Sequence, residues 1–321
     1  MAWKAAARAA LHNMGGLAAL RLINRRKFRV LAFHSFSEAS RANVEAICDH
    51  VTRHFEPLSL SDVADALKRG VELPDDALTI TVDDGYKNYA LYGHPIFRRH
   101  RIPITLFAVS GFAAGRLWLW PDQIDFGLEQ TSKASISIKL GAEEVLPLSS
   151  SQHKADSTSR LTEMLKIVPN QQRLAFMEGF GSLCGVVIPA APPPQRSAMN
   201  WDDLRAVASE GVEIGCHTET HPILTRLESQ AELEREIKGA KQSIEESLGL
   251  PVRHFCYPNG KATDIDDSVV NGVRDAGFDS AVTCFWGLNS NSVEPLRIQR
   301  LPFDSALEFE YALELLAGLH V

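Results

Sequence analysis

Seven short apolar runs recur along the chain, and most of them end in a polar residue suited to chemistry. The runs are RVLAF before His34, LTITV before Asp83, ITLFAVSG from Ile104, VEIGC before His217, RHFCYP ending at Pro258, SAVTCF from Ser280 and RIQRL around Arg300. Most are continuously apolar rather than strictly alternating, which is typical of strands buried on both faces. We therefore expect a mainly parallel sheet of about seven strands.

Helical patterns separate these runs. They cover 61–69, 88–100, 201–210, 229–248 and 265–276. The first begins with a Ser-Asp cap and ends at Gly70, and the long amphipathic segment 229–248 ends at Gly249. Strands that alternate with helices predict repeated βα units in an α/β fold.

The segment from about 112 to 199 breaks this alternation. It holds an Ile/Ser/Lys patch (SISIKL), a polar stretch (SSSQHKADS) and a helical piece, and it leaves through the proline run at 192–194. A proline run is a stiff surface connector. We expect a mainly helical insertion with a small hairpin between two βα units.

The N-terminal residues 1–28 predict a helix. Its uncharged run, 9–20, is too short to span a bilayer, and it has neither the apolar block nor the cleavage site of a signal peptide. The helix either packs on the domain or lies on a membrane surface, because Arg21, Arg25, Arg26 and Lys27 cluster at its end.

Composition excludes several classes of protein. With 45% hydrophobic and 23% charged residues, the chain is neither disordered, collagenous nor coiled-coil. The net charge of −7 gives no general attraction to nucleic acid. Five cysteines without a CxxC pair predict no disulfide framework and no zinc finger, and Cys216, Cys256 and Cys284 are expected in the core. Free thiols and the lack of an export signal predict a cytoplasmic protein, with membrane association as the alternative.

Two adjacent carboxylates follow the second run, in the motif TVDDGY. Asp83 and Asp84 stand at the C-terminal end of an expected strand, where neighbouring side chains point in different directions. One can bind a metal ion while the other acts on a water molecule. The alternative is a plain turn in which an aspartate caps the next helix.

Two histidines follow the fourth run, in the motif HTETHP. His217 and His221 are four residues apart, a spacing that suits a transition metal but also occurs in surface pairs. In a barrel of βα units the C-terminal strand ends meet at the active site. An aspartate and two histidines at that end predict a three-ligand metal site with open positions, as in metal hydrolases.

Together, TVDDGY, HTETHP and the later FCYPNG resemble the signature blocks of the polysaccharide deacetylase family, carbohydrate esterase family four. Members typically have TFDDG, HTxxHP and FAYPYG or RPPY blocks on a deformed (β/α)7 barrel. The resemblance spans about 29–303, apart from the insertion. It implies metal-dependent hydrolysis of an N-acetyl, or sometimes an O-acetyl, group on a sugar.

The resemblance also implies roles for single residues. Asp83 would be the general base, and Asp84, His217 and His221 would bind one divalent ion, zinc in first place, with Co²⁺, Mn²⁺ or Ni²⁺ as alternatives. Tyr257 stands where the family uses a backbone N–H against the oxyanion, although a plain strand-end aromatic fits this position too.

The general acid implied by the resemblance is His34. The sequence FRVLAFHSF is similar to the YHxI block of circularly permuted members, whose first strand supplies the acid, but has Phe33 in place of Tyr and an unusual Ser35. A buried strand-end histidine is the alternative. The late histidine, His320, lies in a terminal tail and is not expected to serve.

Arg300 resembles the arginine that holds the catalytic aspartate in this subgroup. Its alternatives are a surface or interdomain salt bridge, and Arg297 on the opposite face of the strand. Trp286 and Asn289, in FWGLNS, are candidates for lining the sugar site.

The sequence thus predicts a metal-dependent hydrolase that removes N-acetyl groups from an amino-sugar-containing glycan or glycan precursor. Its expected partner is an acetylated glycan and not nucleic acid. An O-acetyl esterase or a non-sugar amidase would use the same site. Two rival interpretations are an inactive carbohydrate-binding relative and a structural or surface-anchored role led by the N-terminal helix and the insertion.

Overall fold

A closed ring of seven parallel strands forms the centre of the computed structural model, which describes residues 15–320. Going round the ring, each strand pairs with the next and the last returns to the first. The strands are β1 (Arg29–Phe33), β3 (Ala77–Val82), β4 (Ile104–Ala108), β7 (Glu213–Cys216), β8 (His254–Cys256), β9 (Ser280–Trp286) and β10 (Ile298–Pro302). The predicted deformed (β/α)7 barrel is confirmed.

The strands are buried on both faces, as their continuous apolar runs predict. In β1, Val30 belongs to a cluster inside the barrel that also holds Phe107 and Val282. Its neighbour Leu31 faces the other way, into the larger cluster under the surrounding helices. A two-residue strand, β2 (Glu56–Pro57), pairs with the start of β3 outside the ring.

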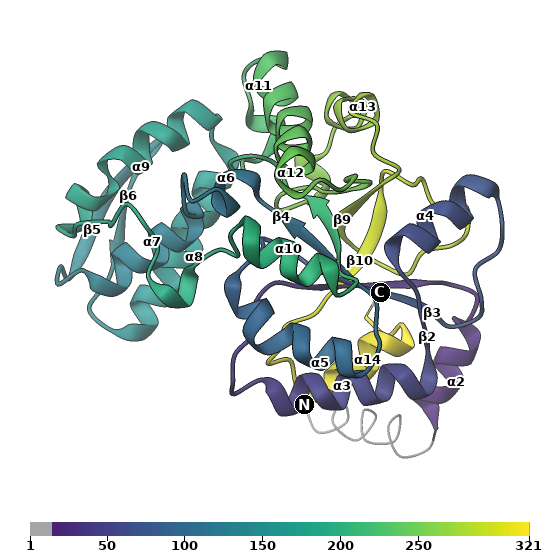
Figure 1. Cartoon of the computed structure of the whole chain (residues 1–321). Helices are drawn as coiled ribbons and strands as arrows, with labels where there is room; N and C mark the ends of the chain where they lie inside the picture. The colour runs from purple at the N-terminus through teal and green to yellow at the C-terminus, as the bar shows by residue number, and fades with distance from the viewer. Residues whose placement is uncertain (1–14, 321) are drawn as a thin grey trace.

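Helices surround the barrel (Figure 1). Capping boxes begin several of them: Ser59 and Asp62 exchange hydrogen bonds at the start of one, and Asn200 and Asp203 at the start of another. The helices are α3 (Arg41–His54), α4 (Leu60–Arg69), η1 (Tyr89–Gly93) with α5 (His94–Arg99), α10 (Trp201–Ser209), α11 (Gln230–Glu234) with η4 (Arg235–Gly239) and α12 (Ala240–Leu248), α13 (Asp267–Asp275) and α14 (Phe309–Ala317).

The insertion forms a lobe beside the barrel, on the left in Figure 1. It leaves after β4 and returns before α10 and β7. A hydrophobic cluster of its own, built on Ile124, Ile138, Leu161 and Phe180, holds it together. Its elements are α6 (Ser110–Ala113), α7 (Trp120–Gln130), the antiparallel pair β5 (Ser135–Leu140) and β6 (Ala142–Pro147), α8 (Ser151–Ile167) and α9 (Asn170–Cys184).

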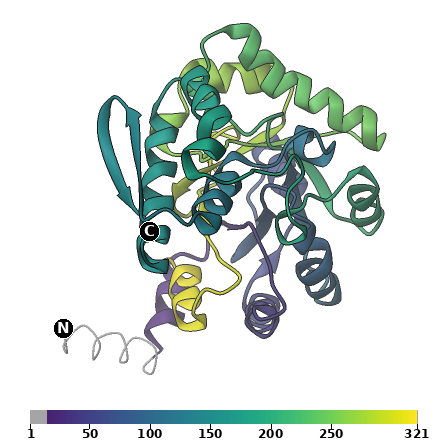
Figure 2. The same ribbon diagram turned by 90° about the vertical axis from the view of Figure 1, so that its left-hand side faces the viewer.

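At the other end of the chain, α2 (Gly16–Ile23) packs against α14. Figures 1 and 2 both place them side by side, at the end of the barrel where β1 begins. Asn24 donates to Ala317 O (3.1 Å) and Arg29 to Leu316 O (2.6 Å). The first part of the expected N-terminal helix, 1–14, lies outside the described residues. No helix in the described part of the chain is both long and apolar enough to cross a membrane.

Candidate active site

A sharp turn after β3 sends its two carboxylates in different directions. Asp84 and Gly85 both adopt left-handed backbone, with φ of 70° and 78°. The Asp83 side chain consequently meets Arg300, whereas that of Asp84 meets two histidines. This is the division between the two carboxylates that the sequence motif predicts.

Three potential metal ligands converge at the C-terminal end of the barrel. Asp84 Oδ1 lies 3.4 Å from His217 Nε2 and 3.4 Å from His221 Nε2, and the two Nε2 atoms are 3.2 Å apart. His217 and Asp84 are buried, and the His221 side chain is 14% exposed. The structure therefore brings together the three residues that the sequence assigns to one metal ion.

The chemistry of these three groups fits a divalent cation. Among the described residues, no hydrogen-bond partner satisfies the buried Asp84 Oδ1. His217 Nδ1 donates to Cys256 O (2.7 Å), so in the neutral ring the lone pair is on Nε2, which faces Asp84. Burial lowers the pKa of His221 to about 3, which keeps this ring neutral. Burial acts in the same direction on His217, but the nearby Asp84 carboxylate and the charge of Asp83 outweigh it and raise the pKa of His217, so a cation at this site would take the place of a proton. Two imidazole lone pairs and a carboxylate oxygen without a partner form a suitable ligand set.

Asp83 is held in a different manner. Arg300 Nη1 and Nη2 each lie 2.8 Å from one of its carboxylate oxygens, and both side chains are buried. Burial by itself raises the pKa of Asp83, but the charges of Arg300 and His34 outweigh burial and hold that pKa well below its ordinary range. Arg300 therefore favours the ionised form of Asp83, beside the three potential metal ligands.

Asp83, His217 and Cys256 form a second cluster, with ligand atoms within 4.8 Å of one another. Arg300 occupies both Asp83 oxygens, so this group fits a cation less well than the set built on Asp84. The thiols of Cys256 and Cys284 lie 3.2 and 3.6 Å from Arg300 Nη2. The sequence pattern indicates only core cysteines there, and these contacts near the base were missed.

His34, the expected acid, and His320, which is not expected to serve, lie at opposite ends of the barrel. His34 follows β1, and its Nε2 lies 3.6 Å from Asp83 Oδ2, with 52% of the side chain exposed. It is thus not the buried strand-end histidine of the alternative interpretation. His320 pairs with Glu314 of α14 (3.0 Å), near the end of the barrel where β1 begins.

The position of Tyr257 departs from its predicted role. Its backbone N–H donates to Val282 O (3.2 Å) in the ladder between β8 and β9, and its hydroxyl donates to Leu296 O (3.0 Å). The N–H is thus already committed to the sheet. Tyr257 is therefore better described as a buried aromatic residue at the end of a strand than as a donor to an oxyanion.

The contacts of Arg297 and Asn289 decide against the roles considered for them, whereas Trp286 stays a candidate for lining the sugar site. Arg297 pairs with Asp267 and Glu294 at the surface, so it is not the arginine that holds Asp83. Asn289 is buried and bonds both backbone groups of Gln299, so it does not line a sugar site. Trp286 ends β9 with 56% of its surface exposed.

The loop that carries His217 and His221 is strained and tightly held. Thr218 and His221 have left-handed backbone, with φ of 69° and 58°. The buried carboxylate of Glu236 accepts from Glu219 N (3.0 Å) and Thr220 N (2.9 Å). The sequence motif does not reveal Glu236, because this residue lies in the next helix among many other charged residues.

The start of α6 holds the other side of this loop. Gly111 N donates to Glu219 O (3.0 Å), and a Cβ atom at this glycine would lie only 2.6 Å from the same oxygen. Glycine is therefore required for the close approach of the two backbones.

A cavity of about 230 Å³ opens over the candidate residues. It is lined by groups from the barrel, namely His34, Asp83, Asp84, His217, His221, Ile223, Tyr257, Asn259 and Cys284. The insertion adds Trp120, Pro121, Thr162 and Lys166. None of these four was singled out from the sequence as a site residue, because no local motif marks a contact between segments that are far apart in the chain.

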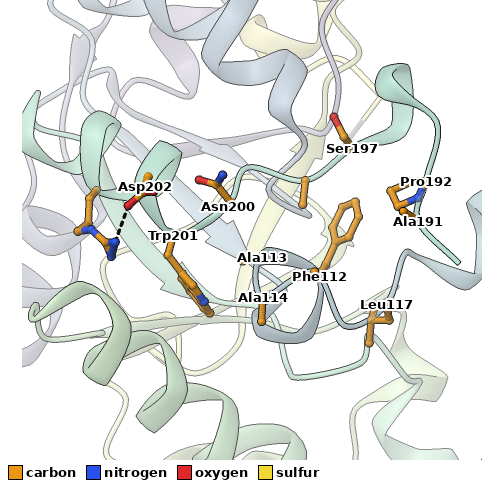
Figure 3. Close-up of a pocket in the computed structure, with 13 residues that line it drawn as sticks. Phe112, Ala113, Ala114, Leu117, Ala191, Pro192, Ser197, Asn200, Trp201 and Asp202 are labelled. Atoms are coloured by element: carbon orange, nitrogen blue, oxygen red, sulfur yellow. Dashed lines mark hydrogen bonds and ion pairs between the residues drawn. The ribbon is translucent and has the colours of Figure 1, made fainter.

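A second, larger cavity of about 510 Å³ lies between α6 and α10 (Figure 3). Phe112, Leu117 and Trp201 give it apolar walls, and Asn200, Asp202 and Arg205 are among its polar groups. None of the candidate catalytic or metal-binding residues lines this cavity.

Comparison with known proteins supports the resemblance seen in the motifs. Residues 192–281 match the family model described as polysaccharide deacetylase, a segment that contains HTETHP and FCYPNG. No curated protein matches the sequence.

Three solved structures share the fold at low sequence identity. IcaB from Ammonifex degensii is 16% identical, with a TM-score of 0.58 over 91% of this chain and 97% of that one. The Streptococcus pyogenes deacetylase PplD, in complex with acetate, is 15% identical, with a TM-score of 0.57 over 90% and 98%. A de-N-acetylase from Aggregatibacter actinomycetemcomitans is 16% identical, with a TM-score of 0.55 over 90% and 99%.

Proposed function

We propose that this chain, a relative of the polysaccharide deacetylases by its fold and by the sequence of residues 192–281, is a metal-dependent hydrolase. It removes N-acetyl groups from an amino-sugar-containing glycan or glycan precursor with the help of a divalent metal ion. One observation carries the proposal. The Asp84–His217–His221 ligand set lies beside a carboxylate that Arg300 keeps ionised, in a cavity that His34 also lines.

Asp84, His217 and His221 would hold the ion, and zinc suits two imidazoles and a carboxylate. When bound, such an ion supplies Lewis-acid polarisation of the acetyl carbonyl and acidification of a water molecule. Buried ligands with fixed tautomers, such as His217 with its bond to Cys256 O, need little rearrangement to bind the ion.

Asp83 takes the proton of the attacking water in this proposal. One of its oxygens lies within 4.8 Å of a ring nitrogen of His217, so a water molecule near the metal ligands is within reach. Arg300 keeps this carboxylate ionised and fixes its orientation, while a lone pair on either oxygen remains available to accept the proton.

His34 protonates the departing amine in this proposal. Amide hydrolysis forms a carbon–oxygen bond from water and breaks the carbon–nitrogen bond, and the amine leaves only when its nitrogen gains a proton. A half-exposed imidazole 3.6 Å from Asp83 can collect a proton from solvent and deliver it inside the cavity. The products are acetate and a free amino sugar.

The cavity walls suit an acetylated sugar. Trp120, Pro121 and Ile223 provide apolar surface for the acetyl methyl group and a sugar face. Thr162, Lys166 and Asn259 provide polar groups for hydroxyls or for an anionic substituent. Insertion and barrel together therefore enclose the substrate.

The proposal is tested by acetate release from a matched panel. The purified chain is incubated with N-acetylated amino-sugar oligomers and with the same backbones carrying only O-acetyl groups. We expect acetate from the N-acetylated members. Release from the O-acetylated members alone would make the chain an esterase, and release from neither, with metal bound, would favour an inactive binding relative.

A further inference from the structure

The insertion contacts the metal-ligand loop through Trp120, the first residue of α7. The indole Nε1 donates to His221 O (3.1 Å), although the two residues are 101 positions apart. Trp120 is 5% exposed and also lines the catalytic cavity. A residue of the insertion thus bonds the backbone of a metal ligand directly.

His221 needs external support to keep its conformation. Its φ of 58° is unfavourable for a residue with a side chain, and Thr218, three positions earlier, has a φ of 69°. Such residues persist where surrounding contacts fix them. Thr218 Oγ1 accepts from His221 N (3.0 Å), and Trp120 holds the carbonyl on the other side of the same residue.

Trp120 is itself held by a buried charge. The guanidinium carbon of Arg173, in α9, lies 5.2 Å from the centre of a Trp120 ring, in cation–π contact. Arg173 is 4% exposed, and its Nε and Nη2 donate to the Asn170 amide oxygen at 3.2 and 2.7 Å. Burial lowers the pKa of Arg173 to about 10, so the cation is retained near neutral pH.

We propose that the insertion completes the metal site: Trp120 is a positioning residue that fixes His221 for metal binding, and Arg173 is a positioning residue that fixes Trp120. This inference rests on the proposed metal-dependent function. Figure 1 shows α7 and α9 together in the lobe beside the barrel, so two helices of the insertion support one ligand of the barrel. The insertion therefore acts in metal retention as well as in enclosing the substrate.

The test is the dissociation constant for Zn²⁺, measured on the full chain by competition with a chromophoric chelator. Trp120→Phe keeps an aromatic ring for Arg173 and removes the N–H that bonds His221 O. We expect the dissociation constant to rise about tenfold, the lower range for outer-shell partners of metal ligands. Added Zn²⁺ should restore part of the lost turnover, which a merely misfolded variant would not show.

Trp118→Phe is the matched control. Trp118 is equally buried in the same segment but packs in another cluster, against Phe126. It should keep the parental dissociation constant. An equal loss in both variants would mean that the insertion had simply loosened, and an unchanged constant in Trp120→Phe would overturn the proposal.

Arg173→Met provides a second, independent variant. It removes the cation and keeps an apolar chain against the indole, so we expect a smaller rise in the dissociation constant, together with a changed visible spectrum of the Co²⁺-substituted protein. A spectrum and an affinity equal to those of the parent would contradict the role of Arg173. If the parent itself binds no Zn²⁺, the proposed function fails, whereas parental binding with insensitive variants refutes only this inference.

Discussion

Arg300 holds both carboxylate oxygens of Asp83, each at 2.8 Å, in a fully buried pair that joins β10 to the turn after β3. Arg300 Nε and Nη1 also donate to Thr283 O (2.8 Å) and Thr81 Oγ1 (3.1 Å). This fixed guanidinium determines the charge state of the candidate base, and the first prediction follows from it.

Arg300→Gln should move the acidic limb of the pH–rate profile to higher pH. With Arg300 present, the pKa of Asp83 is lowered, so the carboxylate stays ionised until the solution is strongly acidic. Without the cation, burial raises that pKa, and activity should fall earlier as the pH decreases, by about 1–3 pH units. The measurement is kcat/KM against pH at saturating metal.

Arg297→Gln is the control for this change, because Arg297 pairs with Asp267 and Glu294 at the surface. Its profile should match that of the parent. If Arg300→Gln also keeps the parental profile, Asp83 is not the group whose ionisation limits turnover.

Asp83→Asn should keep the metal and lose most turnover. The carboxylate acts on water and not on the ion, and removing a general base costs about 10²–10⁴-fold in rate. Metal content and acetate release are measured on the same sample. A variant nearly as active as the parent, or one free of metal, would mean that the roles of Asp83 and Asp84 are exchanged.

The same substitution should reduce stability, since it leaves the Arg300 charge buried without its partner. Breaking such a pair costs about 3–5 kcal/mol. Because the folded pKa of Asp83 is depressed, the pair stabilises the parent above the unfolded pKa of an aspartate, and this contribution is lost as pH falls through the folded pKa. Urea unfolding at neutral pH tests this, and the double variant Asp83→Asn/Arg300→Met should recover part of the loss.

His34→Ala should nearly abolish N-deacetylation and spare much of the turnover of an activated aryl acetate. A neutral amine leaves only when protonated, whereas an activated phenolate leaves without a proton. The side chain is 52% exposed, so its removal should not disturb folding. His320→Ala, at the other end of the barrel, is the control and should change neither rate. Equal losses on both substrates in His34→Ala would show that His34 binds substrate or is structural.

His217→Ala should lose metal and activity together while the barrel stays folded. This imidazole supplies one of three converging ligands, and two ligands hold a divalent ion much less well. Metal content by atomic emission and far-ultraviolet circular dichroism are the two readouts. Full metal occupancy in the variant would refute the assignment of the ligands.

The seven barrel strands could be predicted because burial on both faces leaves an unbroken apolar run in each. By contrast, α3 and α14 are absent from the expected elements. The N-cap of α3, Ser40, makes no side-chain capping bond, and α14 is apolar over much of its surface, partly because α2 covers it. Neither helix begins with a side-chain capping bond, although Val44, Ile47, Cys48 and Val51 of α3 follow the spacing of an amphipathic helix.

The residues of the site likewise fall into those that a sequence motif reveals and those that it does not. Asp84, His217 and His221 lie in two short motifs at strand ends, so their convergence follows from the barrel itself. Trp120, Arg173 and Glu236 support the same centre through contacts that only the folded chain creates. The backbone N–H of Tyr257 is not free for the predicted donor role, because it donates to Val282 O in the ladder between β8 and β9. A motif predicts which residue type stands at a position, but it does not predict the hydrogen bonds that the backbone of this chain makes there.

The circularly permuted type, the identity of the metal and the choice of an N-acetyl over an O-acetyl substrate stay predictions. The location of the protein, cytoplasmic with membrane association as the alternative, is likewise a prediction. The circularly permuted type is inferred from His34, which follows the first strand. The experiment on His34 as the general acid therefore also tests the permuted type.

The central claim is that the Asp84–His217–His221 centre makes this chain a metal-dependent N-deacetylase. The most direct measurement is acetate release from an N-acetylated amino-sugar oligomer by the parent protein before chelation, after complete chelation and dialysis, and after addition of one equivalent of Zn²⁺. We predict acetate release that chelation abolishes and that the single equivalent restores, with His217→Ala inactive throughout. Undiminished release from the metal-free parent would contradict the account.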